Sequence, residues 1–153
     1  MTFDRSDYWY DKALESYCET NKKEPSNLTE DDYDQIHYYA GNHIGFFLAW
    51  IIKHDFIGEI HKEYDKEAVE AVKNEKMSGV EFFIEYCDAK FLDEDVSEEI
   101  LPFVEKYYKK YMSEYVEWVI EELCDLPMEF IGTWEDYHNF EHILDEAYQN
   151  YCA

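Results

Sequence analysis

The sequence predicts an all-α or mainly α fold, a single compact domain of about six helices around a buried central helix at residues 41–54. Residues 44–52 form an uncharged run of nine, in a chain in which 33% of the residues are charged. A helix that is apolar on every side has no face for solvent, so it belongs in the core. The run is also shorter than the roughly 20 residues that span a bilayer. With only 5 Gly and 3 Pro, the chain lacks the turn residues of an all-β sandwich.

The N-terminal forty residues predict two helices. Residues 4–19 carry apolar side chains at helical spacing, and the polar stretch 21–27, which contains Pro25, ends that helix. Thr29 is a suitable N-cap for the second helix, because the three acidic residues after it would occupy the first turn, where the helix dipole favours them. We expect the second helix to bend or break at Gly41, before the central helix begins.

Two short helices are predicted between the central helix and residue 97. Asp65 is a candidate cap for a helix at residues 66–76. Ser78 and Glu81 form a capping-box pattern, in which each side chain would bond the backbone amide of the other residue. The acidic run 93–95 then predicts a solvated connection.

The C-terminal third predicts two further helices. Apolar and aromatic residues recur at alternating spacings of three and four across residues 98–123, which is the helical period. Pro102 falls in the first turns of that helix, where a missing amide costs little. A small strand pair can lie near residues 126–133. Thr133 and Asp136 then form a cap for the final helix.

Charge limits the classes of partner. The net charge is -24, and the last 43 residues contain eleven acidic residues but no Lys or Arg. Such a surface repels nucleic acid and anionic membranes and attracts basic proteins. The distribution therefore predicts either a solubilising acidic face or a docking surface for a positively charged protein.

The cysteines indicate a reducing compartment. Cys18, Cys87, Cys124 and Cys152 are widely spaced and form no C-x-x-C pair. The N-terminus has no basic segment followed by an apolar run, so no signal peptide is expected. We therefore predict a cytoplasmic protein with reduced thiols that mostly fill the core.

Histidines and carboxylates form several weak patterns. Residues 138–142 fit H-x-x-E-H, an inverted zinc-peptidase pattern, without the third ligand that this mechanism requires. Glu135-x-x-His138 and Asp34-x-x-His37 resemble halves of a di-metal carboxylate site, but a complete site needs two Glu-x-x-His motifs and two further Glu. His43 and His54 lie three turns apart and cannot share one metal. The sequence predicts no catalytic residue, no metal and no cofactor.

The high aromatic content, 19% of the chain, has two interpretations. Tyrosine rings can line the edge of the core with their hydroxyls in water, or they can contribute to an acidic, aromatic-rich docking surface, since Tyr and Trp are enriched at interface hot spots. The predicted binding residues are Tyr107, Tyr111, Glu114, Tyr115, Glu117, Glu121, Glu122, Asp125, Glu129, Glu135 and Asp136.

Residues 42–50 (NHIGFFLAW) resemble the H-I-G-x-F-L-A-W signature of a largely uncharacterised bacterial domain family. The resemblance continues through short strings at 58–61, 81–88, 90–95 and 133–137. Residues 1–153 are therefore expected to form one domain, with 41–153 as its family-like core and 1–40 as an N-terminal helical segment that matches poorly. His43, Gly45 and Trp50 are the structural signature residues.

The resemblance implies a function without catalytic residues. Small acidic proteins of this kind resemble immunity proteins of polymorphic or contact-dependent toxin systems. The expected partner is a cognate toxin domain, basic in charge as many nucleases are, with no direct contact to nucleic acid or membrane. Two alternatives stay open: a metal- or small-molecule-binding enzyme that uses His43, His54 or the 138–142 cluster, and a homo-oligomeric interaction module.

Overall fold

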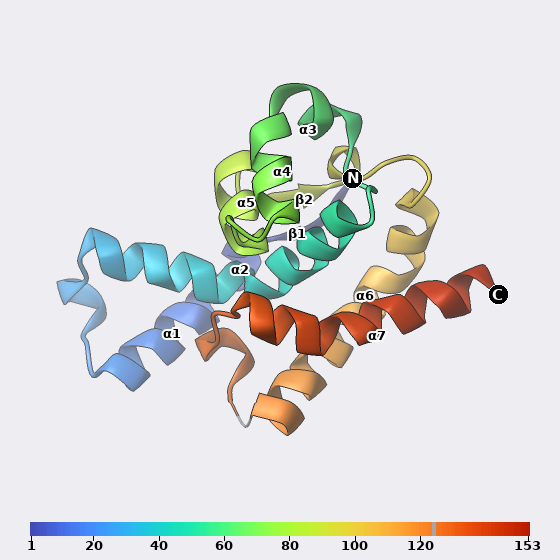
Figure 1. The fold of residues 1–153 in the computed structure, drawn as a ribbon. Helices are drawn as coiled ribbons and strands as arrows, with labels where there is room; N and C mark the ends of the chain where they lie inside the picture. Colours follow the sequence, from blue (N-terminus) through green and yellow to red (C-terminus); the bar gives the residue numbers. More distant parts are fainter. Residues whose placement is uncertain (124) are drawn as a thin grey trace.

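The computed structural model describes residues 1–123 and 125–153, and these residues form a mainly helical domain with one two-stranded antiparallel sheet (Figure 1). Seven α-helices lie in this part of the chain, in agreement with the predicted class. In chain order the elements are β1 (Thr2–Arg5), α1 (Tyr10–Asn21), α2 (Glu30–Lys53), α3 (Glu59–Tyr64), α4 (Lys66–Lys73), α5 (Gly79–Tyr86), β2 (Lys90–Leu92), α6 (Leu101–Trp118) and α7 (Trp134–Cys152).

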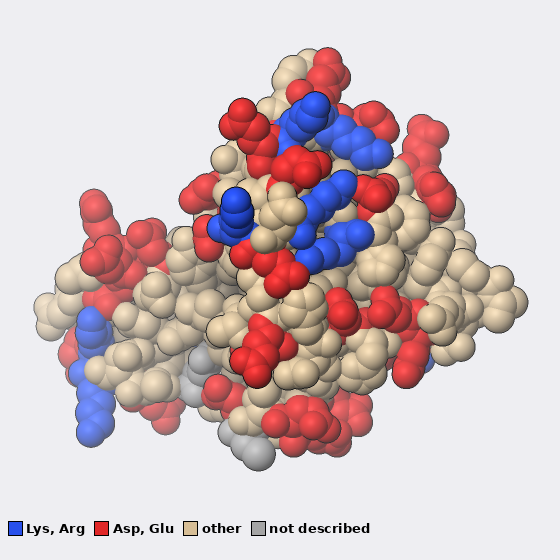
Figure 2. All heavy atoms as spheres, viewed as in Figure 1, with Lys and Arg blue, Asp and Glu red and all other residues tan. Residues whose placement is uncertain are grey.

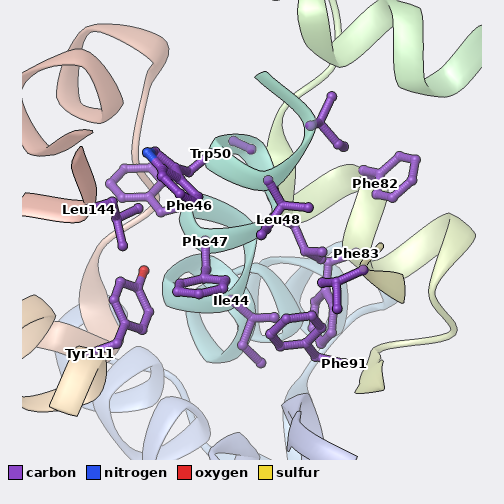
Figure 3. Packing of buried hydrophobic residues seen from close by; sticks show 14 of the residues in the cluster. Ile44, Phe46, Phe47, Leu48, Trp50, Phe82, Phe83, Phe91, Tyr111 and Leu144 are labelled. Atoms are coloured by element: carbon purple, nitrogen blue, oxygen red, sulfur yellow. The ribbon is translucent and has the colours of Figure 1, made fainter. Parts of the chain in front are cut away.

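Helix α2 is the centre of the fold, as the apolar run predicts. Every residue from Ala40 to Ile52 is buried. Figure 3 shows Phe46 and Trp50 on the side of Leu144 in α7, while Ile44 lies near Phe91 of β2 on the other side. The helix is therefore covered from several directions, which is why it needs no polar face.

Of the predicted bend or break at Gly41, the break is wrong, because α2 is one continuous helix of 24 residues. A glycine weakens a helix by only about 1 kcal/mol, and the packing on both sides of this residue holds the helix together. Thr29 caps the helix as predicted: its hydroxyl accepts a hydrogen bond from the Asp32 amide at 3.2 Å, and the Asp32 carboxylate accepts one from the Thr29 amide at 2.9 Å.

Helices α2 and α5 cross at two glycines. A Cβ atom built on Gly45 would lie 2.4 Å from the backbone nitrogen of Val80, and one built on Gly79 would lie 1.9 Å from the Gly45 carbonyl oxygen. Both distances are far below van der Waals contact. The backbones can therefore approach this closely only because neither residue has a side chain.

The strands lie elsewhere than predicted. Residues 127–129 form a 3₁₀ turn, and the sheet instead pairs β1 with β2, with Asp4 opposite Phe91. Proline has no N–H to donate to a ladder, so Pro127 suits the start of a turn better than a strand. The pairing of Thr2–Arg5 with β2 also explains why the first helix begins at Tyr10 and not at residue 4.

Other helix ends shift by a few residues. The helix predicted at 66–76 ends at Lys73, and the one predicted at 98–123 runs as α-helix from Leu101 to Trp118. It continues as a π-helical turn over Val119–Leu123. The predicted cap at Thr133 is confirmed by reciprocal bonds with Asp136, both 3.0 to 3.1 Å long. No helix in the described ranges is long and apolar enough to cross a membrane.

Candidate functional site

A cleft lies between α7 and the C-terminal half of α6 with its π-helical turn. Two adjoining hollows of about 460 and 230 Å³ share Glu114, Glu117 and Ile143 in their walls. We call this cleft the acidic groove. Lys110 also lines the larger hollow, but the residues that define the groove are Glu114, Glu117, Glu121, Glu122, Ile143 and Glu146.

The helical repeat explains why these carboxylates gather. Glu114 and Glu117 are three residues apart and project from one face of α6, and Glu121 follows four residues later in the π-helical turn. The π-helical turn inserts extra backbone at Val119–Leu123 and carries both Glu121 and Glu122 into the cleft wall. Such single π-turns are rare and occur frequently at functional sites.

Most carboxylates of the groove have no basic partner. In the described part of the chain, Glu117, Glu121 and Glu122 form no ion pair, while Glu114 lies 3.8 Å from the Lys110 ammonium. Glu114 also accepts a hydrogen bond from the Tyr107 hydroxyl at 3.3 Å. Burial, together with this carboxylate, raises the pKa of Tyr107, so the phenol stays neutral. The groove therefore presents uncompensated negative charge in a concave surface, which focuses the field.

Basic residues gather on a different part of the molecule. Figure 2 shows one group of blue side chains over the region of α3 to α5 and a second at the left near α1, whereas red side chains dominate the lower edge near α6 and α7. Several of these cations are already paired: Lys53 contacts Glu75 at 2.6 Å, and Lys73 contacts Asp55. Charge is therefore unevenly distributed: Lys side chains pair with carboxylates in the region of α3 to α5, which is remote in sequence from the groove.

The tyrosines predicted to bind a partner lie in the core. Tyr107 is 8% exposed, and Tyr111 and Tyr115 are fully buried. The Tyr111 hydroxyl donates to the His43 carbonyl oxygen at 2.5 Å, and the Tyr115 hydroxyl accepts from the Asn42 side chain at 2.8 Å. Helix α6 packs against both α2 and α7, so it buries more than one stripe of side chains. These three tyrosines therefore pack in the core and do not form a docking surface.

The remaining predicted acids differ in their availability. Glu135 and Asp125 are exposed. The Asp136 carboxylate caps α7 through the Thr133 amide and hydroxyl, which leaves it less free to meet a partner. The side chain of Glu129 lies outside the described residues. Of the predicted set, Glu114, Glu117, Glu121 and Glu122 are brought together.

The signature residues have structural partners. His43 is fully buried, with Nε2 at 3.0 Å from the Asp4 carboxylate, which also accepts hydrogen bonds from Trp9 and Tyr108. Burial raises the pKa of Asp4, but the imidazole and these hydrogen bonds outweigh it, so the pKa is lowered overall. Trp50 donates its indole N–H to Asp145 at 2.9 Å.

The other predicted metal patterns do not assemble. His138 Nε2 lies 2.9 Å from a Glu75 carboxylate oxygen, which raises the pKa of His138 and commits this nitrogen to an ion pair. His54 stacks on the Trp50 ring at 4.4 Å between centroids, and its Nδ1 bonds the Trp50 carbonyl. Among the described residues, neither histidine belongs to a group of three convergent ligands.

One buried cluster was missed by sequence reasoning. His61, Cys87 and Asp95 each place a ligand atom within 4.8 Å of the other two. Burial opposes the charged imidazolium, but the carboxylates of Asp95 and Asp65 outweigh it and raise the pKa of His61; burial also raises the pKa of the Cys87 thiol. The only sequence signal near this cluster is the spacing of four between His61 and Asp65, which predicts that these two side chains meet on one helix face.

Comparison with known proteins gives a family without an assigned activity. The model of the family described as domain of unknown function DUF7832 matches residues 2–128. The match includes the N-terminal forty residues and excludes α7. No curated protein and no solved structure shows significant similarity to the chain.

Proposed function

This chain belongs to the family described as domain of unknown function DUF7832, and we propose that it is an immunity-type protein that binds and neutralises a basic toxin domain. The acidic groove is the proposed docking surface. The observation that carries the proposal is the set of unpaired carboxylates in a concave wall, formed by Glu117, Glu121 and Glu122.

Charge supports a basic protein as the partner. A net charge of -24 on 153 residues creates a long-range field, and the groove concentrates unpaired charge where the chain contains no Lys or Arg after Lys110. Such a surface steers a cationic partner and can raise its association rate by roughly 10- to 1000-fold. The same charge opposes binding of nucleic acid and disfavours self-association through two acidic grooves.

Shape and rigidity support a preformed surface. The floor of the groove includes the Trp118 and Ile143 side chains, and Trp118 packs on Phe140 at 5.1 Å between ring centroids. Beneath it, Tyr115 and Phe140 are fully buried. Tyr115 and Phe140 thus hold the two walls in place from beneath the groove. A preorganised surface loses little conformational entropy on binding.

Inhibition would follow from occupation of the substrate path. A nuclease binds phosphates with Lys and Arg side chains, and the carboxylates of the groove can form ion pairs with the same side chains. The partner's active site need not be contacted directly, because a bound acidic domain excludes nucleic acid by charge and by volume.

Gene context and binding test the proposal. A toxin domain encoded immediately upstream supports the proposed class, whereas a metabolic operon contradicts it. With that toxin domain purified, the association rate is measured by stopped flow at several salt concentrations for the wild type and for Glu121→Lys/Glu122→Lys. We expect association to slow at least tenfold at low salt and to depend less on salt.

A matched control separates the groove from net charge alone. Glu15→Lys/Glu19→Lys changes the charge equally on exposed positions of α1, which contributes no residue to the groove. The control is expected to retain most of the wild-type rate. Equal rates for the two double variants would contradict the groove as the docking surface.

A further inference from the structure

The cluster of His61, Cys87 and Asp95 is separate from the acidic groove and joins three segments of the chain. His61 lies in α3, Cys87 directly follows α5, and Asp95 ends the 3₁₀ turn Asp93–Asp95 after β2. All three are almost fully buried, with 3%, 8% and 4% exposure. Imidazole nitrogen, thiolate sulfur and carboxylate oxygen therefore converge in the interior. We propose that this cluster is a binding site for a single zinc ion.

The donor distances fit a tetrahedral ion. The Nε2 atom of His61 lies 3.7 Å from the Cys87 sulfur and 2.6 Å from Oδ1 of Asp95. Zinc bonds of about 2.0 to 2.1 Å to nitrogen and about 2.3 Å to sulfur place these two donors roughly 3.5 Å apart. The nitrogen and sulfur are thus already at the required separation. The Asp95 oxygen must retreat by somewhat less than about 1 Å, which a carboxylate rotation supplies.

Hydrogen bonds already orient two of the three donors. The Nδ1 atom of His61 lies 2.7 Å from the Asp65 carboxylate. An Nδ1–H that donates a hydrogen bond to Asp65 leaves Nε2 as the nitrogen that binds a metal, once the proton shared with Asp95 has left. The backbone amide of Leu92 donates to Oδ2 of Asp95 at 2.7 Å, which leaves Oδ1 directed at the histidine. A carboxylate behind a ligating histidine is the usual arrangement at protein zinc sites.

The donor set selects the metal class. One nitrogen, one sulfur and one oxygen suit a borderline ion such as zinc, whereas calcium and magnesium prefer oxygen ligands throughout. Zinc binding replaces the Cys87 thiol proton and the proton shared between His61 and Asp95, and both protons leave to solvent. Three protein ligands fill three tetrahedral positions, and a water molecule takes the fourth.

A Cys–His–Asp nucleophile arrangement fits less well. Cys87, His61 and Asp65 do follow one another at 3.7 and 2.7 Å. However, Asp95 occupies the Nε2 side of the ring that would have to receive the thiol proton. The sulfur is also buried against α3 and the 93–95 turn, where a substrate cannot reach it. A nucleophilic cysteine does not need Asp95, whereas a metal site needs it as the third ligand.

Cobalt provides a direct spectroscopic test. Untagged protein is treated with a chelator and titrated with Co²⁺, and a stoichiometric thiolate-to-cobalt charge-transfer band with tetrahedral d–d bands is expected. Cys87→Ser should abolish the charge-transfer band, whereas Cys18→Ser, at a buried cysteine of α1, should retain it. Zinc should displace cobalt and raise the melting temperature of the wild type.

A variant of Asp65, which contacts His61 and is not itself a proposed ligand, keeps the proposal testable if Cys87→Ser fails to fold. Asp65→Asn retains all three donors and the side-chain volume, and it should lower zinc affinity about 10- to 100-fold by isothermal titration calorimetry. Absence of a cobalt band in the wild type, its survival in Cys87→Ser, or unchanged affinity in Asp65→Asn would overturn the site. Rapid alkylation of Cys87 by iodoacetamide without metal binding would favour the nucleophile arrangement instead.

Discussion

Replacing Gly45 by alanine tests whether the crossing of α2 and α5 depends on a missing side chain. The new Cβ would lie 2.4 Å from the nitrogen and 2.6 Å from the Cα of Val80, both of them backbone atoms. Ordinary contact begins near 3.4 Å, so the two helices must separate by about 1 Å. A flexible side chain could move aside, but a helix backbone moves only together with its whole packing surface.

The expected cost follows from two opposing effects. Alanine improves helix propensity by about 1 kcal/mol. Overpacking in a close-packed core costs about 1 to 3 kcal/mol and more when backbone must move, so we place this substitution at the upper end. The net loss is then about 2 kcal/mol or more. For a chain of this size that lowers the melting temperature by roughly 4 to 8 °C.

Gly41→Ala is the matched control, one turn earlier in the same helix. Its new Cβ would lie 3.1 Å from two ring carbons of Phe83, which can shift by a few tenths of an ångström. The propensity gain is therefore largely retained, and the stability should stay within about 1 kcal/mol of wild type. Thermal and urea unfolding by circular dichroism compare the two variants. If Gly45→Ala is as stable as Gly41→Ala, the close crossing is not a constraint.

Two further predictions concern buried polar groups. The Lys23 ammonium and the hydrogen bonds around Asp32 hold the pKa of that carboxyl well below its usual range. The stability that Asp32 contributes is therefore present above the unfolded pKa of about 3.9 and is lost as pH falls below it. Asp32→Asn should lower the melting temperature at pH 6 but reduce its decline between about pH 5 and pH 3, and an unchanged decline would contradict this. The Asn42 side chain accepts a hydrogen bond from the Gly132 amide at 3.0 Å and donates one to the Tyr115 hydroxyl. Asn42→Ala leaves both of these groups without that partner and should lower the free energy of unfolding, measured in urea, by about 3 kcal/mol. A loss below about 1 kcal/mol would show that water replaces the side-chain amide.

Sequence periodicity predicted the helical class well because the core pattern is strong. The uncharged run became the buried centre of α2, and the aromatic repeat became α6. Cap patterns at Thr29 and Thr133 were confirmed because a cap depends only on residues within one turn. Local rules did not suffice everywhere: the side chain of Asp65, the predicted cap of α4, makes no capping hydrogen bond and lies 2.7 Å from His61 Nδ1 instead.

Several of the errors involve distant partners. The first residues form a strand because β2 lies beside them, which no nearby residue indicates. Asp4 is buried because His43, Trp9 and Tyr108 surround its carboxylate. Gly41 does not break α2, since packing outweighs a propensity loss of about 1 kcal/mol.

The sequence by itself determined the charge, the helical class and the central helix, because composition and spacing follow directly from residue order. It also determined that the C-terminal stretch is acidic, since no Lys or Arg follows Lys110. Only the tertiary structure decided which carboxylates share a groove, which tyrosines are buried, and that His61, Cys87 and Asp95 meet. These features depend on how separate helices pack against one another, and packing is a property of surfaces that meet only after the chain has folded.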